Sequence, residues 1–222
     1  MASALAVGAT IAAFASAPTP ADTPTVAFEI AQVTRPVALF AHRGGPAVAR
    51  LGASTEFGSR QTLGVVGKSG QWLRVTSTEL PNGRTGWVRA RAVRLTTTPK
   101  SLTIDLSRRL LLFKRGDRVV RRMTVTIGRP GSPTPTGRFA VTDKLAGSNY
   151  GPYYGCCIVA LSAHQPNLPA GWTGGNRIAV HGTNAPSTIG APASAGCLRA
   201  RDADLRVLMR GVPLGTPVFI RP

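Results

Sequence analysis

The chain has 222 residues, 43% hydrophobic and 16% charged, which suits one or two folded domains. Lys and Arg number 27 against 9 Asp and Glu, giving a formal net charge of +18. Plentiful aliphatic residues exclude an intrinsically disordered chain, and the lack of a long apolar run beyond the N-terminal segment excludes a bundle of membrane-spanning helices. Three cysteines are too few for a disulfide scaffold.

Residues 1–26 are predicted to be an export signal followed by a Pro/Thr-rich segment. The first 21 residues are uncharged and mostly aliphatic, and Ala13-Phe14-Ala15 matches the small-x-small cleavage pattern. The basic start that such signals usually have is missing. We expect an exported protein of the cell wall or extracytoplasmic space, with no stable membrane span after cleavage. A disordered Ala/Pro tail and a retained anchor are the alternatives.

Residues 27–95 are predicted to form a small β-barrel. Residues 71–75 alternate between polar and apolar, as a half-buried strand does, and a second strand is expected at 86–88. Pro81-Asn82-Gly83-Arg84 between them is a turn signal. Five short strands in this segment indicate a barrel. The polar residues 96–99 are interpreted as a linker to a second domain, 99–222.

The second domain is also predicted to be rich in β-strands. Gly, Pro, Asn and Ser are frequent between residues 128 and 175, so long loops are expected there. One short helix is expected near the C-terminus, with Asp202 as its cap, an apolar face and Gly211 at its end. Strands are expected at 102–106, 109–113, 119–127 and 218–220.

The chemistry is concentrated in His181 and Cys197, which are separated by fifteen residues. A cysteine with an ordinary pKa is mostly protonated at neutral pH, so a catalytic thiol needs a base, and an ion pair with His181 would lower its pKa. Successive backbone N–H groups at Gly196 and Cys197 would suit an oxyanion hole. On these residues alone, a buried apolar cysteine and a hydrogen-bonded histidine are equally good interpretations.

His181-Gly182-Thr183 and Ser194-Ala195-Gly196-Cys197-Leu198-Arg199 together resemble the active-site signature of the L,D-transpeptidases, the YkuD-like family. Residues 134–139 and 215–218 are similar to further segments of that family, in the same order. The pattern around Trp72 and Trp87 resembles a bacterial SH3-like domain. The implied fold class is mainly β: a small SH3-like barrel, then a β-rich catalytic domain with one short C-terminal helix.

The resemblance implies a peptidoglycan L,D-transpeptidase, an acyltransferase without cofactor or metal that forms 3→3 cross-links through a cysteine thioester and releases D-alanine from a tetrapeptide stem. Cys197 would be the nucleophile and His181 the general base and acid, with the Gly182 carbonyl orienting the imidazole. Ala195 departs from the pattern, because many members have a second histidine there. The residues expected to bind substrate are Ser194, Gly196, Arg199 and Thr183.

Two other functions remain open. One is a peptidoglycan L,D-carboxypeptidase or cysteine peptidase, in which water resolves the thioester. The other is a non-catalytic wall-binding protein that uses residues 27–95. The expected partners are peptidoglycan stem peptides and anionic wall polymers, which the dispersed arginines would attract. Nucleic acid is not expected, because no basic patch is interleaved with aromatic residues.

Cys156 and Cys157 are adjacent in a Tyr/Gly-rich loop and are interpreted as small apolar packing residues. Adjacent cysteines bridge only with strain, because their Cα atoms are about 3.8 Å apart. The alternatives are redox masking of Cys197 and a zinc site with His164. Trp172 is expected either to line the substrate cleft or to anchor its own loop.

Overall fold

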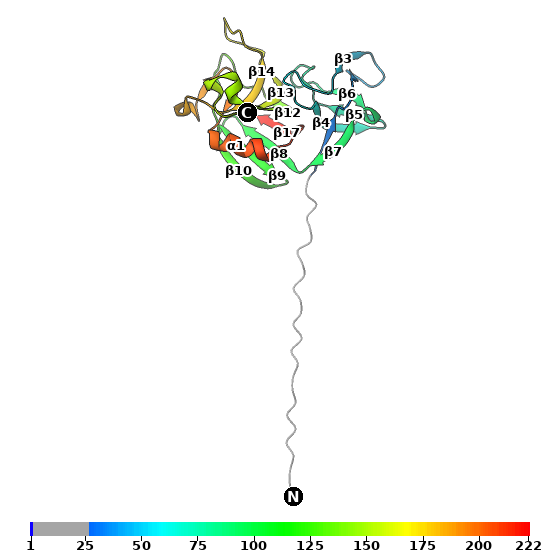
Figure 1. Ribbon diagram of the computed structural model, residues 1–222, viewed down its shortest axis with the longest axis horizontal. Helices are drawn as coiled ribbons and strands as arrows, with labels where there is room; N and C mark the ends of the chain where they lie inside the picture. The colour runs from blue at the N-terminus through cyan, green and yellow to red at the C-terminus, as the bar shows by residue number, and fades with distance from the viewer. Residues whose placement is uncertain (2–26) are drawn as a thin grey trace.

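The computed structural model describes residue 1 and residues 27–222, so the predicted export segment lies outside the described residues. The described chain forms two lobes, each built on its own β-sheet (Figure 1). The fold is mainly β, as predicted, and the described residues contain one α-helix. None of their helical segments is long and apolar enough to cross a membrane.

The first lobe is a seven-stranded sheet in the order β3-β2-β6-β5-β4-β1-β7. Its core contains Leu39, Leu73, Val75 and Val88, which come from alternate positions of their strands. A short 3-10 helix, η1 (Ala90–Ala92), follows β6. The strands are β1 (Phe28–Gln32), β2 (Val37–Phe40), β3 (Ala47–Leu51), β4 (Thr62–Ser69), β5 (Trp72–Val75), β6 (Gly86–Arg89) and β7 (Arg94–Thr98).

Two details of this lobe differ from the sequence prediction. Seven strands are present where five were expected, and the outer strands β3 and β7 do not pair with each other in the described chain. Residues 96–98, expected as a linker, instead belong to β7 and pair with β1 in the register Phe28↔Thr98. The first sheet therefore runs three residues past the predicted boundary at residue 95, and Pro99 separates it from the next strand.

The second lobe is an eight-stranded sheet in the order β10-β9-β8-β17-β12-β13-β14-β16, with a two-stranded parallel sheet of β11 and β15 beside it. The prediction of long loops between residues 128 and 175 is wrong in part, because two of its longest strands lie there. β12 is buried from Phe139 to Asp143, and β13 is buried from Cys157 to Ala163. The strands are β8 (Lys100–Asp105), β9 (Leu110–Arg115), β10 (Arg118–Thr124), β11 (Ile127–Gly128), β12 (Gly137–Ala146), β13 (Cys157–His164), β14 (Arg177–His181), β15 (Pro192–Ser194), β16 (Leu198–Arg199) and β17 (Pro217–Arg221), and the 3-10 helices are η2 (Gly147–Tyr150), η3 (Pro152–Tyr154) and η4 (Pro186–Thr188).

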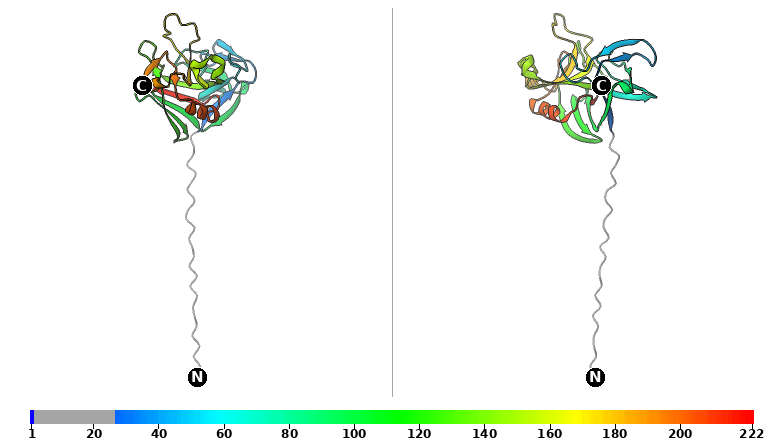
Figure 2. Two further views of the ribbon diagram at one scale, coloured as in Figure 1. Left: turned by 60° about the vertical axis from the view of Figure 1, so that its left-hand side comes forward. Right: turned by 45° about the vertical axis from the view of Figure 1, so that its right-hand side comes forward.

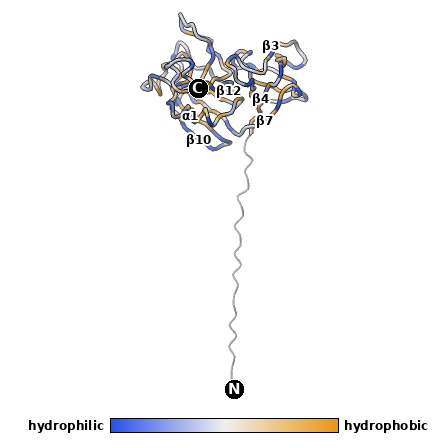
Figure 3. The backbone as a smooth tube through the Cα atoms, viewed as in Figure 1, coloured by the Kyte–Doolittle hydropathy of each residue, from blue (hydrophilic) through white to orange (hydrophobic). Residues whose placement is uncertain are grey.

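Helix α1 (Asp202–Gly211) lies where the sequence predicted it. Leu205 and Leu208 are fully buried in the core of the second lobe. The predicted cap is wrong: the N-cap residue is Arg201, and no side chain makes a capping hydrogen bond. Figure 3 shows hydrophobic and hydrophilic residues close together along the same strands in both lobes, as expected of half-buried sheets.

The two lobes lie side by side in each view of the ribbon (Figure 2) and are joined by hydrogen bonds as well as by the chain. The Asn82 side chain donates to the carbonyl of His164 at 2.6 Å and accepts from its backbone N–H at 2.9 Å. His164 Nε2 donates to the carbonyl of Thr78 at 2.7 Å. Arg138 Nη2 donates to the carbonyl of Val65 at 3.0 Å. These bonds fix the first lobe against the strands that carry the site.

Candidate active site

Strand pairing brings His181 and Cys197 together. β14 ends at His181, Cys197 directly precedes β16, and the two strands pair in parallel in the register Val180↔Leu198. The fifteen intervening residues, which include η4 and β15, return the chain to the side of β14. Both side chains line one cleft with a volume of about 360 Å³. A rigid strand end thus holds each of the two candidate catalytic residues.

The hydrogen bonds of His181 define which of its nitrogens is free. The residue has no exposed surface, and Nδ1 lies 2.6 Å from the carbonyl oxygen of Gly182. A carbonyl only accepts hydrogen bonds, so Nδ1 carries the proton of the neutral imidazole. Nε2 is buried and has no hydrogen-bond partner in the described part of the chain. Its lone pair is therefore available to accept a proton.

Burial opposes a charge on both members of the pair. Burial lowers the pKa of His181 from 6.5 to about 4, against the opposing effect of the Gly182 hydrogen bond. Burial also raises the pKa of the Cys197 thiol, against a backbone hydrogen bond from Ala179 and the charge of Arg199. Burial therefore favours a thiol and a neutral imidazole in this cleft over the expected ion pair.

Ser194 and Gly196 hold the turn that carries Cys197. Ser194 Oγ donates to the carbonyl of Cys197 at 2.6 Å and accepts from the N–H of Gly196 at 3.1 Å. That N–H was predicted to be an oxyanion donor, and here it is already bonded. Gly196 has φ +117°, and a Cβ there would lie 2.1 Å from Gln165 Nε2, so the turn requires glycine.

Arg199 and Thr183 also contact other residues of the protein and do not line the cleft. The Arg199 guanidinium lies 4.7 Å from the centroid of the Tyr153 ring and donates to the Tyr153 hydroxyl. Its Nε has no partner among the described residues. Thr183 Oγ1 accepts from the N–H of Ala185 at 3.0 Å, within a turn. None of the four residues expected to bind substrate lines the cleft: Ser194, Gly196, Arg199 and Thr183.

Aromatic side chains form much of the cleft wall. The rings of Tyr153 and Tyr154 lie 5.6 and 4.9 Å from the His181 ring, centroid to centroid. Trp172 lines the cleft and also anchors its loop, because its Nε1 donates to the carbonyl of Gly175 at 3.0 Å. Phe57, for which the sequence predicted no role, reaches the cleft from the first lobe. No local pattern around Phe57 points to that position.

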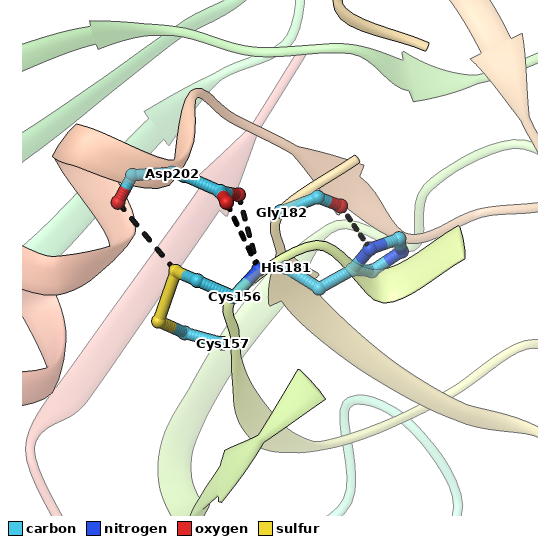
Figure 4. The surroundings of a disulfide bond; sticks show 5 residues. All are labelled: Cys156, Cys157, His181, Gly182 and Asp202. Carbon is cyan, nitrogen blue, oxygen red and sulfur yellow. Dashed lines mark hydrogen bonds between the residues drawn. A yellow bond between two sulfur atoms is a disulfide. The ribbon is translucent and has the colours of Figure 1, made fainter. Parts of the chain in front are cut away.

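Cys156 and Cys157 form a disulfide with each other (Figure 4). Both pack in or against the core of the second lobe, so the prediction of apolar packing is confirmed, although the two sulfurs are bonded to each other. The carboxylate of Asp202 accepts from the N–H of Cys156, with both oxygens at 3.1 Å. That bond occupies the side chain that was predicted to cap α1. A Cβ on Gly182 would lie 2.2 Å from Asp202 Oδ1, so the carboxylate packs directly against Gly182. The disulfide turn and the start of α1 thus support the carbonyl that orients His181.

The zinc and redox-masking alternatives do not fit this arrangement. His164 is bonded to Thr78 and Asn176, and both sulfurs of the proposed zinc site are in the disulfide. Cys197 is free and partly exposed.

Cysteine labelling tests the disulfide. When the protein is denatured and treated with iodoacetamide without a reductant, it should take up one alkyl group, on Cys197. After reduction, it should take up three. The reason is that a disulfide sulfur has no thiolate to react. Peptide mass spectrometry locates the labels. Three labels without reductant would contradict the disulfide, and a Cys156→Ser variant, with two labels in either condition, is the matched control.

Comparison with known proteins places this site in a family. Residues 99–220, more than half of the chain, match the family model of the L,D-transpeptidase catalytic domain. The chain belongs to the L,D-transpeptidase family. It is 31% identical over 126 residues to the L,D-transpeptidase-family protein YkuD of Bacillus licheniformis, covering 57% of this chain and 68% of that protein. With YkuD of Bacillus subtilis it shares 28% identity over 124 residues, which are 56% of this chain and 67% of that one.

The likeness to solved structures is weaker. An L,D-transpeptidase from Mycobacterium smegmatis shares 13% identity and a TM-score of 0.47, over 84% of this chain and 100% of that one. The assignment to the L,D-transpeptidase family therefore rests on the sequence matches. Those matches cover the second lobe, where His181 and Cys197 lie.

Proposed function

We propose that the chain is a peptidoglycan L,D-transpeptidase that forms 3→3 cross-links through a thioester on Cys197. The observation that carries this proposal is the free, unprotonated Nε2 of His181 in the same cleft as the one cysteine of the described chain that is not in a disulfide. Membership of the L,D-transpeptidase family supplies the substrate class, a peptidoglycan tetrapeptide stem.

In the first half-reaction, Cys197 attacks the carbonyl carbon of the third residue of the donor stem. The thiol proton passes to His181 Nε2, and the new carbon–sulfur bond makes a tetrahedral intermediate. The carbon–nitrogen bond to D-alanine then breaks, and the proton on Nε2 moves to the departing amine. The Gly182 carbonyl stabilises the imidazolium that exists between these steps, because it accepts the Nδ1 proton at 2.6 Å.

In the second half-reaction, the side-chain amine of another stem attacks the thioester. His181 takes a proton from that amine and returns it to the sulfur when the carbon–sulfur bond breaks. The products are the 3→3 amide bond and the free thiol of Cys197. Water in place of the amine would give a tripeptide, which is the carboxypeptidase reaction.

Incubation with a disaccharide tetrapeptide tests the proposal. We expect a dimer whose mass equals two substrates less one D-alanine, with the 3→3 bond located by fragmentation in mass spectrometry. Tripeptide without dimer would support the carboxypeptidase instead. Unchanged substrate would contradict both enzymes and favour the wall-binding protein.

We further propose that the first lobe is an SH3-like domain and that the protein works outside the cytoplasm. The strands β5 and β6 carry the two tryptophans on which the SH3-like resemblance rests, and they pair in the register Arg74↔Trp87. The net charge of +18 suits attraction to anionic wall polymers as well as to stem peptides.

A further inference from the structure

A turn of the first lobe reaches into the cleft of the second. The turn begins and ends at the bridge between Ser54 and Arg60, and the N–H of Thr55 donates to the carbonyl of Ser59 at 2.8 Å. Phe57 at its tip lines the cleft, half-buried, while every other residue that lines it comes from the second lobe. The Phe57 ring meets the Tyr150 ring edge to face, with centroids 6.4 Å apart.

The same turn holds a charged side chain of the cleft. Glu56 Oε1 lies 2.7 Å from Arg177 Nη2, and Arg177 Cζ lies 5.8 Å from the centroid of the Phe57 ring. The Arg177 side chain is 13% exposed, and apart from His181 it is the one basic side chain that lines this cleft in the described chain. Its backbone carbonyl lies 3.8 Å from Cys197 Sγ. Arg177 therefore links the turn to the strand that ends in His181.

The position of the turn is fixed by further contacts. Thr55 Oγ1 donates to Asp143 Oδ1 in β12, beside the Arg177–Glu56 pair. Arg177 Nη1 also donates to Thr142 Oγ1 at 3.3 Å. The Thr55–Asp143 bond holds the turn near its base, and the Glu56–Arg177 pair holds it beside its tip.

We propose that the turn of residues 54–60 is a specificity-determining wall of the donor cleft. Phe57 packs against the aliphatic part of a bound stem peptide, and Glu56 is a positioning residue that holds Arg177 at the cleft. The first lobe thus takes part in substrate selection directly, in addition to any binding of wall polymer. This inference rests on the proposed function, because the occupant is a stem peptide.

The cleft also favours this class of occupant. Its lining is largely aromatic and aliphatic, and the guanidinium of Arg177, held by Glu56, lies beside it. A stem peptide combines aliphatic side chains with free carboxylates, so it complements both features. A wall polymer without apolar groups would not use Phe57.

The test compares four variants with the wild type in the disaccharide tetrapeptide assay. We expect Phe57→Ala to raise KM about tenfold with kcat within about twofold, because truncation removes apolar contact but leaves His181 and Cys197 in place. Phe57→Leu should restore most of the loss. Glu56→Gln should raise KM about threefold, since an exposed ion pair contributes little by itself. Val48→Ala, which alters an exposed apolar side chain of the same lobe away from the cleft, should match the wild type.

The outcomes separate this inference from the proposed function. If the wild type is active and Phe57→Ala has an unchanged KM, the turn is not a specificity-determining wall, and the transpeptidase proposal stays intact. A wild type that neither turns over nor binds the tetrapeptide overturns both. If Phe57→Ala lowers kcat in parallel with the thermal unfolding temperature, its role is structural and the inference fails. Binding of the tetrapeptide to Cys197→Ala, with and without Phe57→Ala, gives the same comparison without turnover.

Discussion

Cys197→Ala is expected to take up no carbapenem, whereas the wild type gains the mass of one inhibitor molecule. The variant should also lose at least about a thousandfold in turnover of the tetrapeptide, because alanine has no atom to form the thioester. Cys156 and Cys157 cannot substitute for it, since their sulfurs are bonded to each other. Intact-protein mass spectrometry measures the adduct, and circular dichroism checks that the variant is folded.

The control for this prediction is the double variant Cys156→Ser, Cys157→Ser, which keeps Cys197 and should still form a single adduct. An adduct that maps to another residue would show that Cys197 is not the nucleophile. A folded wild-type protein that forms no adduct under conditions where a known L,D-transpeptidase does would count against the thioester mechanism as a whole.

The sequence predicts strands well where their two faces differ. In β5, Leu73 and Val75 are buried and Arg74 between them is exposed, and this alternation predicted the strand. β12 and β13 were missed because they are buried on both faces, so their central residues give no alternation. The glycines and prolines around them made the segment look like loops. Pairing with β17 and β14 creates these strands, and that information is not local.

The site residues also differ in how far the sequence predicts them. His181, Gly182 and Cys197 lie in short motifs; in the structure His181 and Cys197 line one cleft, and the Gly182 carbonyl is bonded to His181 Nδ1. Phe57 reaches the cleft through the packing of one lobe on the other, which no spacing in the sequence encodes. Asp202 is of a residue type that often caps helices, but its carboxylate accepts instead from the N–H of Cys156, in the turn before β13. In each case a contact between distant segments decides the role.

The burial of His181 links the chemistry to stability. Its pKa falls from 6.5 to about 4 because the imidazolium would lose its water in the cleft wall. The unfolded chain therefore binds a proton more readily than the folded chain does. The stabilising contribution is fully present above pH 6.5, falls as the pH drops from 6.5 towards 4, and changes no further below that.

We therefore expect the wild type to lose about 3 kcal/mol more unfolding free energy between pH 7 and pH 4 than His181→Gln does, since one pKa unit corresponds to about 1.4 kcal/mol. Glutamine does not titrate, and the carboxylates that protonate in this range are common to both proteins. Urea unfolding at the two pH values measures the difference, and an equal loss in both proteins would contradict it.

The acid limb of the kcat/KM profile of the wild type tests the same pKa. We expect kcat/KM to rise through about pH 4, because His181 must be neutral to accept the thiol proton. A limb near pH 6.5 would show an imidazole that is not buried.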